Sequence, residues 1–173
     1  NLKSKITNHS TLAEDKLDDQ SGFVIRKQKG GPAFYLARAF KKEKMPFVLK
    51  SGPLMKTEIL VRKNEEFGKV PKKPKPRNVT FSSIKTPYLV VSTILDEFDL
   101  RSLSKFTGKV FLDVQGYVRD GNNFGKKKMW RPRREIRESI FCLKGTKREL
   151  SSISVNFLKQ QKKKVLLDTN GKR

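Results

Sequence analysis

The feature that most constrains the fold is a series of short apolar runs in the second half of the chain, separated by longer, more polar stretches. The runs are YLVVST (88–93), KVFLDV (109–114), FCLKG (141–145) and KVLLDT (164–169). Runs of this kind are typical of strands covered on both faces. Helical spacing of apolar residues predicts helices at 96–106, 133–140 and from 146 onward. This alternation predicts parallel βαβ units in an α/β fold with a doubly wound, mostly parallel sheet.

The first half of the chain repeats this pattern more weakly. Residues 23–28 (FVIRKQ) alternate apolar and polar side chains, which predicts a half-exposed strand. Residues 30–44 (GGPAFYLARAFKKEK) predict an amphipathic helix that ends in lysines, which are favourable at a helix C-terminus. Short strands are expected at 46–52 (PFVLKSG) and 57–64 (TEILVRKN). The proline and lysine tract at 68–77 is unsuited to a central strand.

Net charge is the strongest compositional signal. The 173 residues include 40 Lys and Arg against 17 Asp and Glu, a formal net charge of +23. Such a field concentrates anions at the surface, whether nucleic acid, phosphorylated metabolites or acidic lipid, and does not choose between them. Solvated loops and helix faces explain most of the basic clusters, which are at 126–128, 131–134 and 162–164.

Cysteine, histidine and hydropathy exclude several classes of protein. Cys142 is the single cysteine, so an intrachain disulfide is excluded, and its apolar neighbours predict a buried structural thiol. One histidine, His9, cannot build a soft-ligand metal site with one distant cysteine. No apolar stretch approaches the length of a membrane span, so we expect a soluble, cytoplasmic protein without a membrane partner.

Polar side chains follow each of the four predicted strands. In open α/β sheets, ligands bind beyond the carboxyl ends of the strands. The strand at 88–93 is followed by an acidic stretch, and the last strand by DTNGKR. The other polar residues at strand ends are Asp113, Gln115, Arg119, Lys144, Thr146 and Glu149. The sequence therefore predicts a polar cleft along one edge of the sheet.

Four motifs resemble those of the ribokinase-like, PfkB-type carbohydrate and nucleoside kinases. QKGGPAFYLARAF resembles the family's glycine pair and following helix, and FLDVQGYVR with the later MW is similar to its Asp-x-Asn-x-Arg loop and nearby tryptophan. LKGTKREL resembles the strand that ends in Asn-x-x-Glu, and VLLDTNGKR the strand that ends in Thr-x-Gly-x-x-Gly. The order and approximate spacing agree over about residues 9–173.

The resemblance implies a set of substrate-binding residues in the first part of the chain. Gly30 and Gly31 would let the backbone approach the hydroxyls of the substrate; the alternative is an ordinary strand-to-helix turn. Asp15 would correspond to the early aspartate that binds two sugar hydroxyls, since a carboxylate accepts several hydrogen bonds. Asp18 and Asp19 compete for that role, and a solvated loop acid is the alternative for all three.

Two further groups of residues follow from the same resemblance. Asp113, Gln115 and Arg119 correspond to the family's Asp, Asn and Arg; the alternatives are a turn-capping Asp113 and an Arg119 that is only surface charge. The residues expected on the phosphate and nucleotide side are Lys144, Thr146, Glu149, Thr169 and Gly171. Thr146 replaces the usual Asn. Glu149 would organise Mg²⁺ through water, or else form a capping box with Thr146.

The resemblance implies a kinase that transfers the γ-phosphate of ATP, with Mg²⁺, to a hydroxyl of a sugar or nucleoside. Residues 1–173 would form a single incomplete ribokinase-like domain with a small β lid within about 22–29 and 56–72. Lid strands of this family often pair between subunits, which implies a homodimer. The family's Gly-Ala-Gly-Asp motif, which carries the catalytic base, does not occur here, and the base is expected beyond Arg173. This chain would supply substrate binding.

The alternative is a basic, non-enzymatic nucleic-acid or polyanion-binding protein derived from a degenerate kinase. Its support is the charge, because many Lys and Arg contacts with phosphates give binding that falls steeply with salt. Against it, the sequence has no helix-turn-helix, RNP-type or zinc signature, and its aromatic residues are mostly placed as core residues.

Overall fold

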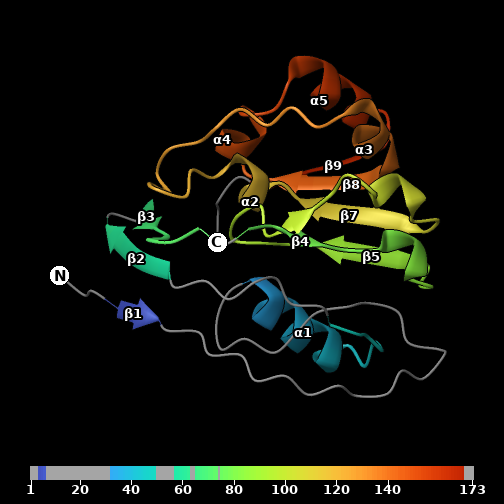
Figure 1. Cartoon of the computed structure of the whole chain (residues 1–173), viewed down its shortest axis with the longest axis horizontal. Coiled ribbons are helices and arrows are strands. Elements are labelled where there is room, and N and C mark those ends of the chain that lie inside the picture. Colours follow the sequence, from blue (N-terminus) through green and yellow to red (C-terminus); the bar gives the residue numbers. More distant parts are fainter. Residues whose placement is uncertain (1–3, 7–31, 50–56, 63–64, 74, 170–173) are drawn as a thin grey trace.

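A four-stranded parallel sheet forms the centre of the protein. The computed structural model describes residues 4–6, 32–49, 57–62, 65–73 and 75–169. The sheet strands are β5 (Tyr88–Val91), β7 (Lys109–Asp113), β8 (Ile140–Gly145) and β9 (Val165–Asp168), hydrogen-bonded in that order (Figure 1). All three pairings are parallel. The predicted mixed α/β fold with a mostly parallel sheet is therefore confirmed.

Short helices occur in each connection between these strands. η2 (Leu103–Lys105) lies between β5 and β7, α2 (Gln115–Val118) and α3 (Arg134–Ser139) lie between β7 and β8, and α4 (Lys147–Leu150) and α5 (Val155–Lys162) lie between β8 and β9. A further short helix, η1 (Phe81–Ser83), precedes β5. Figure 1 shows α3, α4 and α5 together over one face of the sheet. The order β5-β7-β8-β9 advances in one direction without reversing. Doubly wound topology, which requires a reversal, therefore stays a prediction. None of the helices described is long and apolar enough to cross a bilayer.

The main hydrophobic core lies between the sheet and these helices. Successive side chains along a strand point to opposite faces of the sheet, and this explains the core. Leu89, Val110 and Leu112 are buried, whereas Tyr88 and Lys109 are exposed. The helical layer contributes side chains that are almost inaccessible, among them Leu103, Ile153 and Phe157. Burying a side chain of this kind contributes about 1.5–3 kcal/mol. Packing against one face of the sheet thus fixes the positions of the strand ends.

A bulge between β7 and β8 adjusts the register of the sheet. Val110 pairs with Ile140, but Phe111 pairs with Cys142, so Phe141 is the extra residue. The rings of Phe111 and Phe141 are 5.6 Å apart in an edge-to-face arrangement. Cys142 is 2% exposed, and burial raises the pKa of its thiol. The prediction of a buried structural thiol is confirmed.

The predicted helix at 96–106 is wrong. Residues Phe98–Asp99 form a short strand, β6, which pairs in parallel with β4 (Arg77–Asn78), and only η2 is helical. Leu100 and Leu103, whose spacing predicted the helix, are both buried in the core without a continuous helix. Side chains compete for the backbone here: the carboxylate of Asp99 accepts from the Arg101 N–H at 2.9 Å. Such local bonds favour turns over helix.

The helix at 30–44 and the strand at 57–64 are confirmed by α1 (Pro32–Lys42) and β2 (Thr57–Arg62). β2 forms an antiparallel hairpin with β3 (Glu65–Lys69), within the predicted lid, and β1 (Ser4–Ile6) pairs with the other side of β2. The expected strand at 46–52 is wrong over 46–49, which are irregular. Phe47 packs on Phe40 of α1 instead, with ring centroids 5.7 Å apart. Residues 22–29 lie outside the described residues.

We predict that Gly116→Ala destabilises the protein by about 1–3 kcal/mol, the cost of overpacking a filled site. A methyl group on Gly116 would collide with the Thr93 hydroxyl and lie 2.5 Å from the carbonyl oxygen of Leu95. Urea unfolding measures the difference. Gly121→Ala is the matched control, because its nearest neighbour is the movable Leu95 Cδ1 at 3.2 Å. Equal stability of the two variants would contradict the packing described.

Candidate functional site

The carboxyl ends of β5, β7 and β8 bring three polar side chains together. Asp113 is the last residue of β7, Lys144 lies near the end of β8, and Ser92 directly follows β5. Lys144 Nζ donates to Asp113 Oδ2 at 2.6 Å, and Ser92 Oγ donates to the same oxygen at 3.3 Å. Because the strands are parallel and adjacent, polar residues at their ends converge. We name Ser92, Asp113 and Lys144 the strand-end cluster.

Asp113 also connects the strand to the helix that follows. Its side chain is only 9% exposed, and its Oδ1 accepts from the backbone N–H of Gln115 at 3.2 Å. This contact is the turn-capping role that the sequence allowed. The ion pair with Lys144 occurs in addition, so the carboxylate is held from three directions. A carboxylate fixed in this way has a defined orientation at the edge of the sheet.

Arg119 lies buried one turn further along. It is 4% exposed, and its guanidinium lies 4.5 Å from the centre of the Phe124 ring. With the Gln115 amide oriented to satisfy both residues, the Gln115 side-chain oxygen accepts from the Arg119 guanidinium. The interpretation of Arg119 as mere surface charge is therefore wrong, because burial and a ring contact hold it inside the fold. Gln115 and Arg119 therefore lie together, and their correspondence to the family's Asn and Arg stays a prediction.

Thr146 and Glu149 form a capping box at the start of α4. Thr146 donates to Glu149 Oε2 from its backbone N–H at 2.8 Å and from its hydroxyl at 3.0 Å, and the Glu149 N–H donates to Thr146 Oγ1 at 3.3 Å. The capping-box interpretation is confirmed. Within the described part of the chain, no three His, Cys, Asp or Glu residues gather as metal ligands. A water-mediated contact of Glu149 with Mg²⁺ stays a prediction.

The remaining predicted site residues divide into two groups. Thr169 follows β9, is exposed, and donates its N–H to Gly145 O at 2.9 Å, which places it beside the end of β8. The others lie outside the described residues: Asp15, Gly30, Gly31 and Gly171. Their roles stay predictions.

The sequence analysis noted the acidic stretch after β5 but did not single out two residues there. Ser92 contacts the strand-end cluster, and Glu97 is a buried carboxylate in the loop that follows. Glu97 Oε1 accepts from the N–H groups of Ile94 at 2.7 Å and Leu95 at 3.3 Å. Burial raises the pKa of Glu97 to about 7, although these two hydrogen bonds oppose the rise. The available signal was the position of Ser92, the first polar residue after an apolar strand.

No family model, curated protein or solved structure matches the chain.

We predict that Lys144→Met destabilises the protein by about 1–2 kcal/mol, because it removes a charged donor from a carboxylate that stays largely buried. The lower end of the range for charged hydrogen bonds applies because the Lys144 side chain is 46% exposed. Chemical unfolding of Lys144→Met and of exposed Lys147→Met on α4 provides the comparison. A loss no larger in Lys144→Met than in the control would refute the ion pair.

We predict that stability falls as pH rises from about 5 to 8, through Glu97. Its folded pKa of about 7 lies above the ordinary value of 4.5, so the folded chain binds a proton that the unfolded chain releases. The contribution of protonated Glu97 to the free energy of unfolding is on the order of 3 kcal/mol. It is fully present below pH 4.5 and is lost as pH rises through 7. Glu97→Gln, which keeps a side-chain acceptor, should remove this slope. Identical pH profiles of unfolding for the two proteins would exclude this role.

Proposed function

We propose that this chain is the substrate-binding part of a PfkB-type kinase that transfers the γ-phosphate of ATP to a hydroxyl of a sugar or nucleoside. One observation supports the proposal above all: residues from two of the motifs that resemble this family meet at adjacent strand ends. Asp113 and Lys144 are joined at 2.6 Å although 31 positions apart in the chain. The carboxyl edge of a parallel sheet is also where ligands of such folds bind.

The chemistry of the strand-end cluster suits a polyhydroxylated substrate. A carboxylate accepts several hydrogen bonds, the Lys144 ammonium offers three donors, and the Ser92 hydroxyl can donate and accept. Lys144 compensates the charge of the Asp113 carboxylate, which is largely excluded from water. Neighbouring hydroxyls of a sugar ring could bind Asp113 and Ser92 together. The described residues would bind and orient the substrate, which is a major source of rate in phosphoryl transfer.

ATP and Mg²⁺ enter this proposal through the resemblance. When bound, they would supply the phosphoryl group and the neutralisation of its charge. We assign no transfer step to the described residues, since Glu149 Oε2 is already engaged by Thr146. A cytoplasmic location and a homodimer formed through lid strands belong to the same proposal.

The test is isothermal titration calorimetry of the full chain against a panel of sugars and nucleosides. We predict that at least one compound binds and that Asp113→Asn weakens its binding at least about tenfold, which corresponds to about 1.4 kcal/mol. Asp120→Asn is the matched control, because the Asp120 carboxylate serves a local turn, accepting from the Asn122 N–H at 2.8 Å. Absence of binding across the panel, or equal affinity of the two variants, would overturn the proposal.

A further inference from the structure

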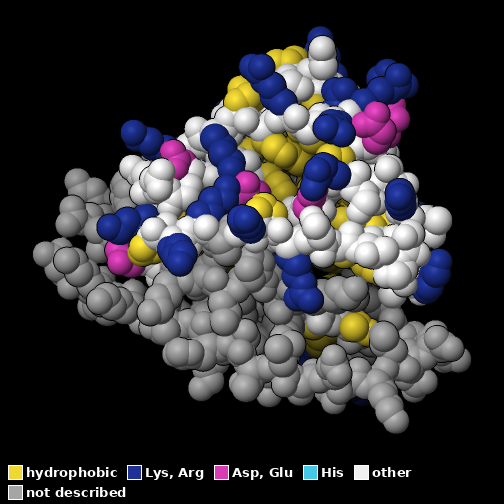
Figure 2. Space-filling view, viewed as in Figure 1, with side chains coloured by type: hydrophobic (Ala, Val, Ile, Leu, Met, Phe, Trp, Pro, Cys, Tyr) yellow, Lys and Arg dark blue, Asp and Glu magenta, His cyan; other side chains and the backbone are white. Residues whose placement is uncertain are grey.

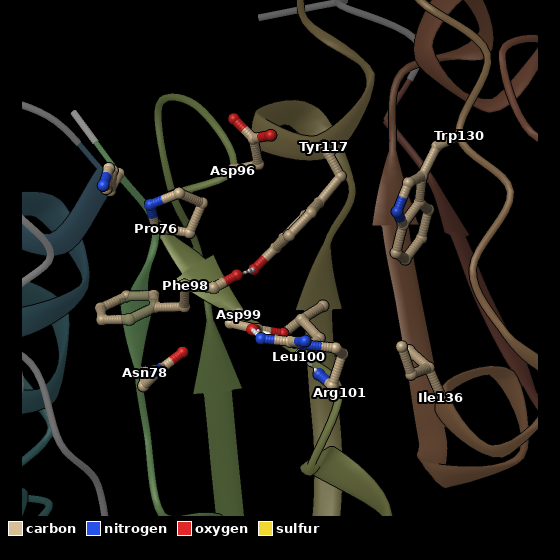
Figure 3. A pocket seen from close by; sticks show the side chains of 11 residues that line it. Pro76, Asn78, Asp96, Phe98, Asp99, Leu100, Arg101, Tyr117, Trp130 and Ile136 are labelled. Carbon is tan, nitrogen blue, oxygen red and sulfur yellow. Dashed lines mark hydrogen bonds and ion pairs between the residues drawn. The ribbon is translucent and has the colours of Figure 1, made fainter. Parts of the chain in front are cut away.

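A separate cavity of about 500 Å³ opens beside the small β4–β6 sheet. This volume is within the usual range of ligand sites. The cavity shares no residue with the strand-end cluster. Figure 3 shows Trp130 and Ile136 on one side of it and Phe98 and Asn78 on the other, with Tyr117 between them. We name this cavity the aromatic groove. It is lined by Lys75, Pro76, Asn78, Asp96, Phe98, Asp99, Leu100, Arg101, Tyr117, Trp130 and Ile136.

The aromatic side chains of the groove are held in place. The Tyr117 hydroxyl donates to Phe98 O at 3.3 Å, and the rings of Tyr117 and Trp130 are 5.1 Å apart with a 31° angle between their planes. The backbone N–H of Trp130 donates to Ser152 O at 2.9 Å, which fixes the chain at this residue. Trp130 nevertheless remains partly exposed, whereas Tyr117 beneath it is only 5% exposed. Flat, fixed aromatic surfaces with accessible area are what unpaired nucleobases stack on.

The charge around the groove is positive even though two acids line it. Asp99 accepts from Arg101 Nε at 2.6 Å; this bond, together with nearby Arg133, lowers the pKa of Asp99. Asp96 lies between two lysines, Lys73 at 2.7 Å and Lys128 at 3.4 Å. Both carboxylates are thus compensated. Exposed Lys75 lines the groove and exposed Arg133 lies near Asp99, so positive charge is in excess here.

The segment at 126–134, KKKMWRPRR, carries this combination in sequence. Three lysines precede Trp130, and three arginines follow it. Trp130 lines the groove, while Lys126, Arg131 and Arg133 are exposed. A base-stacking residue with cations on both sides suits a chain of alternating bases and phosphates. The sequence analysis placed the aromatic residues mostly in the core, and Trp130 does pack against the core on one side while it lines the groove.

We propose that the aromatic groove binds single-stranded nucleic acid, with one base in the groove against Trp130 and with flanking phosphates on Arg133 and Lys75. A polymer is favoured over a small anion because Lys and Arg side chains spread widely over the described part of the face in Figure 2. A polymer contacts many of these cations at once, whereas a small anion contacts few. A single strand is favoured over a duplex because its bases are free to enter the groove.

The chain offers a direct probe of this site, since Trp130 is its only tryptophan. The experiment titrates the full chain with a 12-nucleotide single strand and, separately, with a duplex of the same length, following tryptophan emission and the anisotropy of a labelled strand over a salt series. We expect the single strand to quench tryptophan emission and to bind at least about tenfold more tightly than the duplex, with affinity that falls as salt rises.

Two double variants distinguish binding at a defined site from binding by charge spread over the surface. Lys75→Gln with Arg133→Gln removes the excess charge at the groove, and Lys159→Gln with Lys162→Gln removes the same charge from exposed positions on α5. We expect the groove pair to lose roughly tenfold or more in affinity, with a shallower salt dependence, and the α5 pair to lose several-fold less. Equal losses in the two pairs, unchanged tryptophan emission, or equal binding of duplex and single strand would overturn the proposal. Asp113→Asn should leave this binding unchanged.

Discussion

The position of β7 within the parallel sheet is the constraint on which the rest of the structure depends. β7 pairs with β5 on one side and β8 on the other, and both pairings are parallel. The apolar side chains of β7, among them Val110 and Leu112, are buried against the helical layer. The end of this strand therefore has one position relative to its neighbours. Asp113 meets Lys144 and Ser92 because the strands that carry them end side by side.

The sequence predicted the strands well because each is a short apolar run that can be buried only in a sheet. It also predicted that Asp113 and Lys144 would share an edge, since both follow such runs. It failed at 96–106, where the spacing of Leu100 and Leu103 is compatible with a helix as well as with two separate packing contacts. The carboxylates of Asp99 and Glu97 accept local hydrogen bonds from backbone N–H groups here, and such bonds favour turns over helix. The periodicity of apolar residues does not reveal such local hydrogen bonds.

The burial of Arg119 and the aromatic groove were beyond sequence reasoning for a different reason. Both depend on how the loops after β7 fold back on themselves: Arg119 lies over Phe124, and Trp130 packs beside Tyr117. A pattern of charges does not reveal which cation becomes enclosed.

The two proposed sites depend on different physical interactions. The strand-end cluster relies on a fixed carboxylate in a largely buried position, and the groove on aromatic surface within an excess of positive charge.

The central claim is that β7 lies between β5 and β8 in parallel, with Asp113 beside Lys144. The most direct measurement is solution NMR of the labelled chain, read for nuclear Overhauser effects between neighbouring strands. The account predicts cross-strand signals that connect Leu112 with Leu143 and Asp113 with Lys144, in the pattern of parallel pairing. Signals that instead connect β7 with β9, or that show an antiparallel pattern, would contradict it.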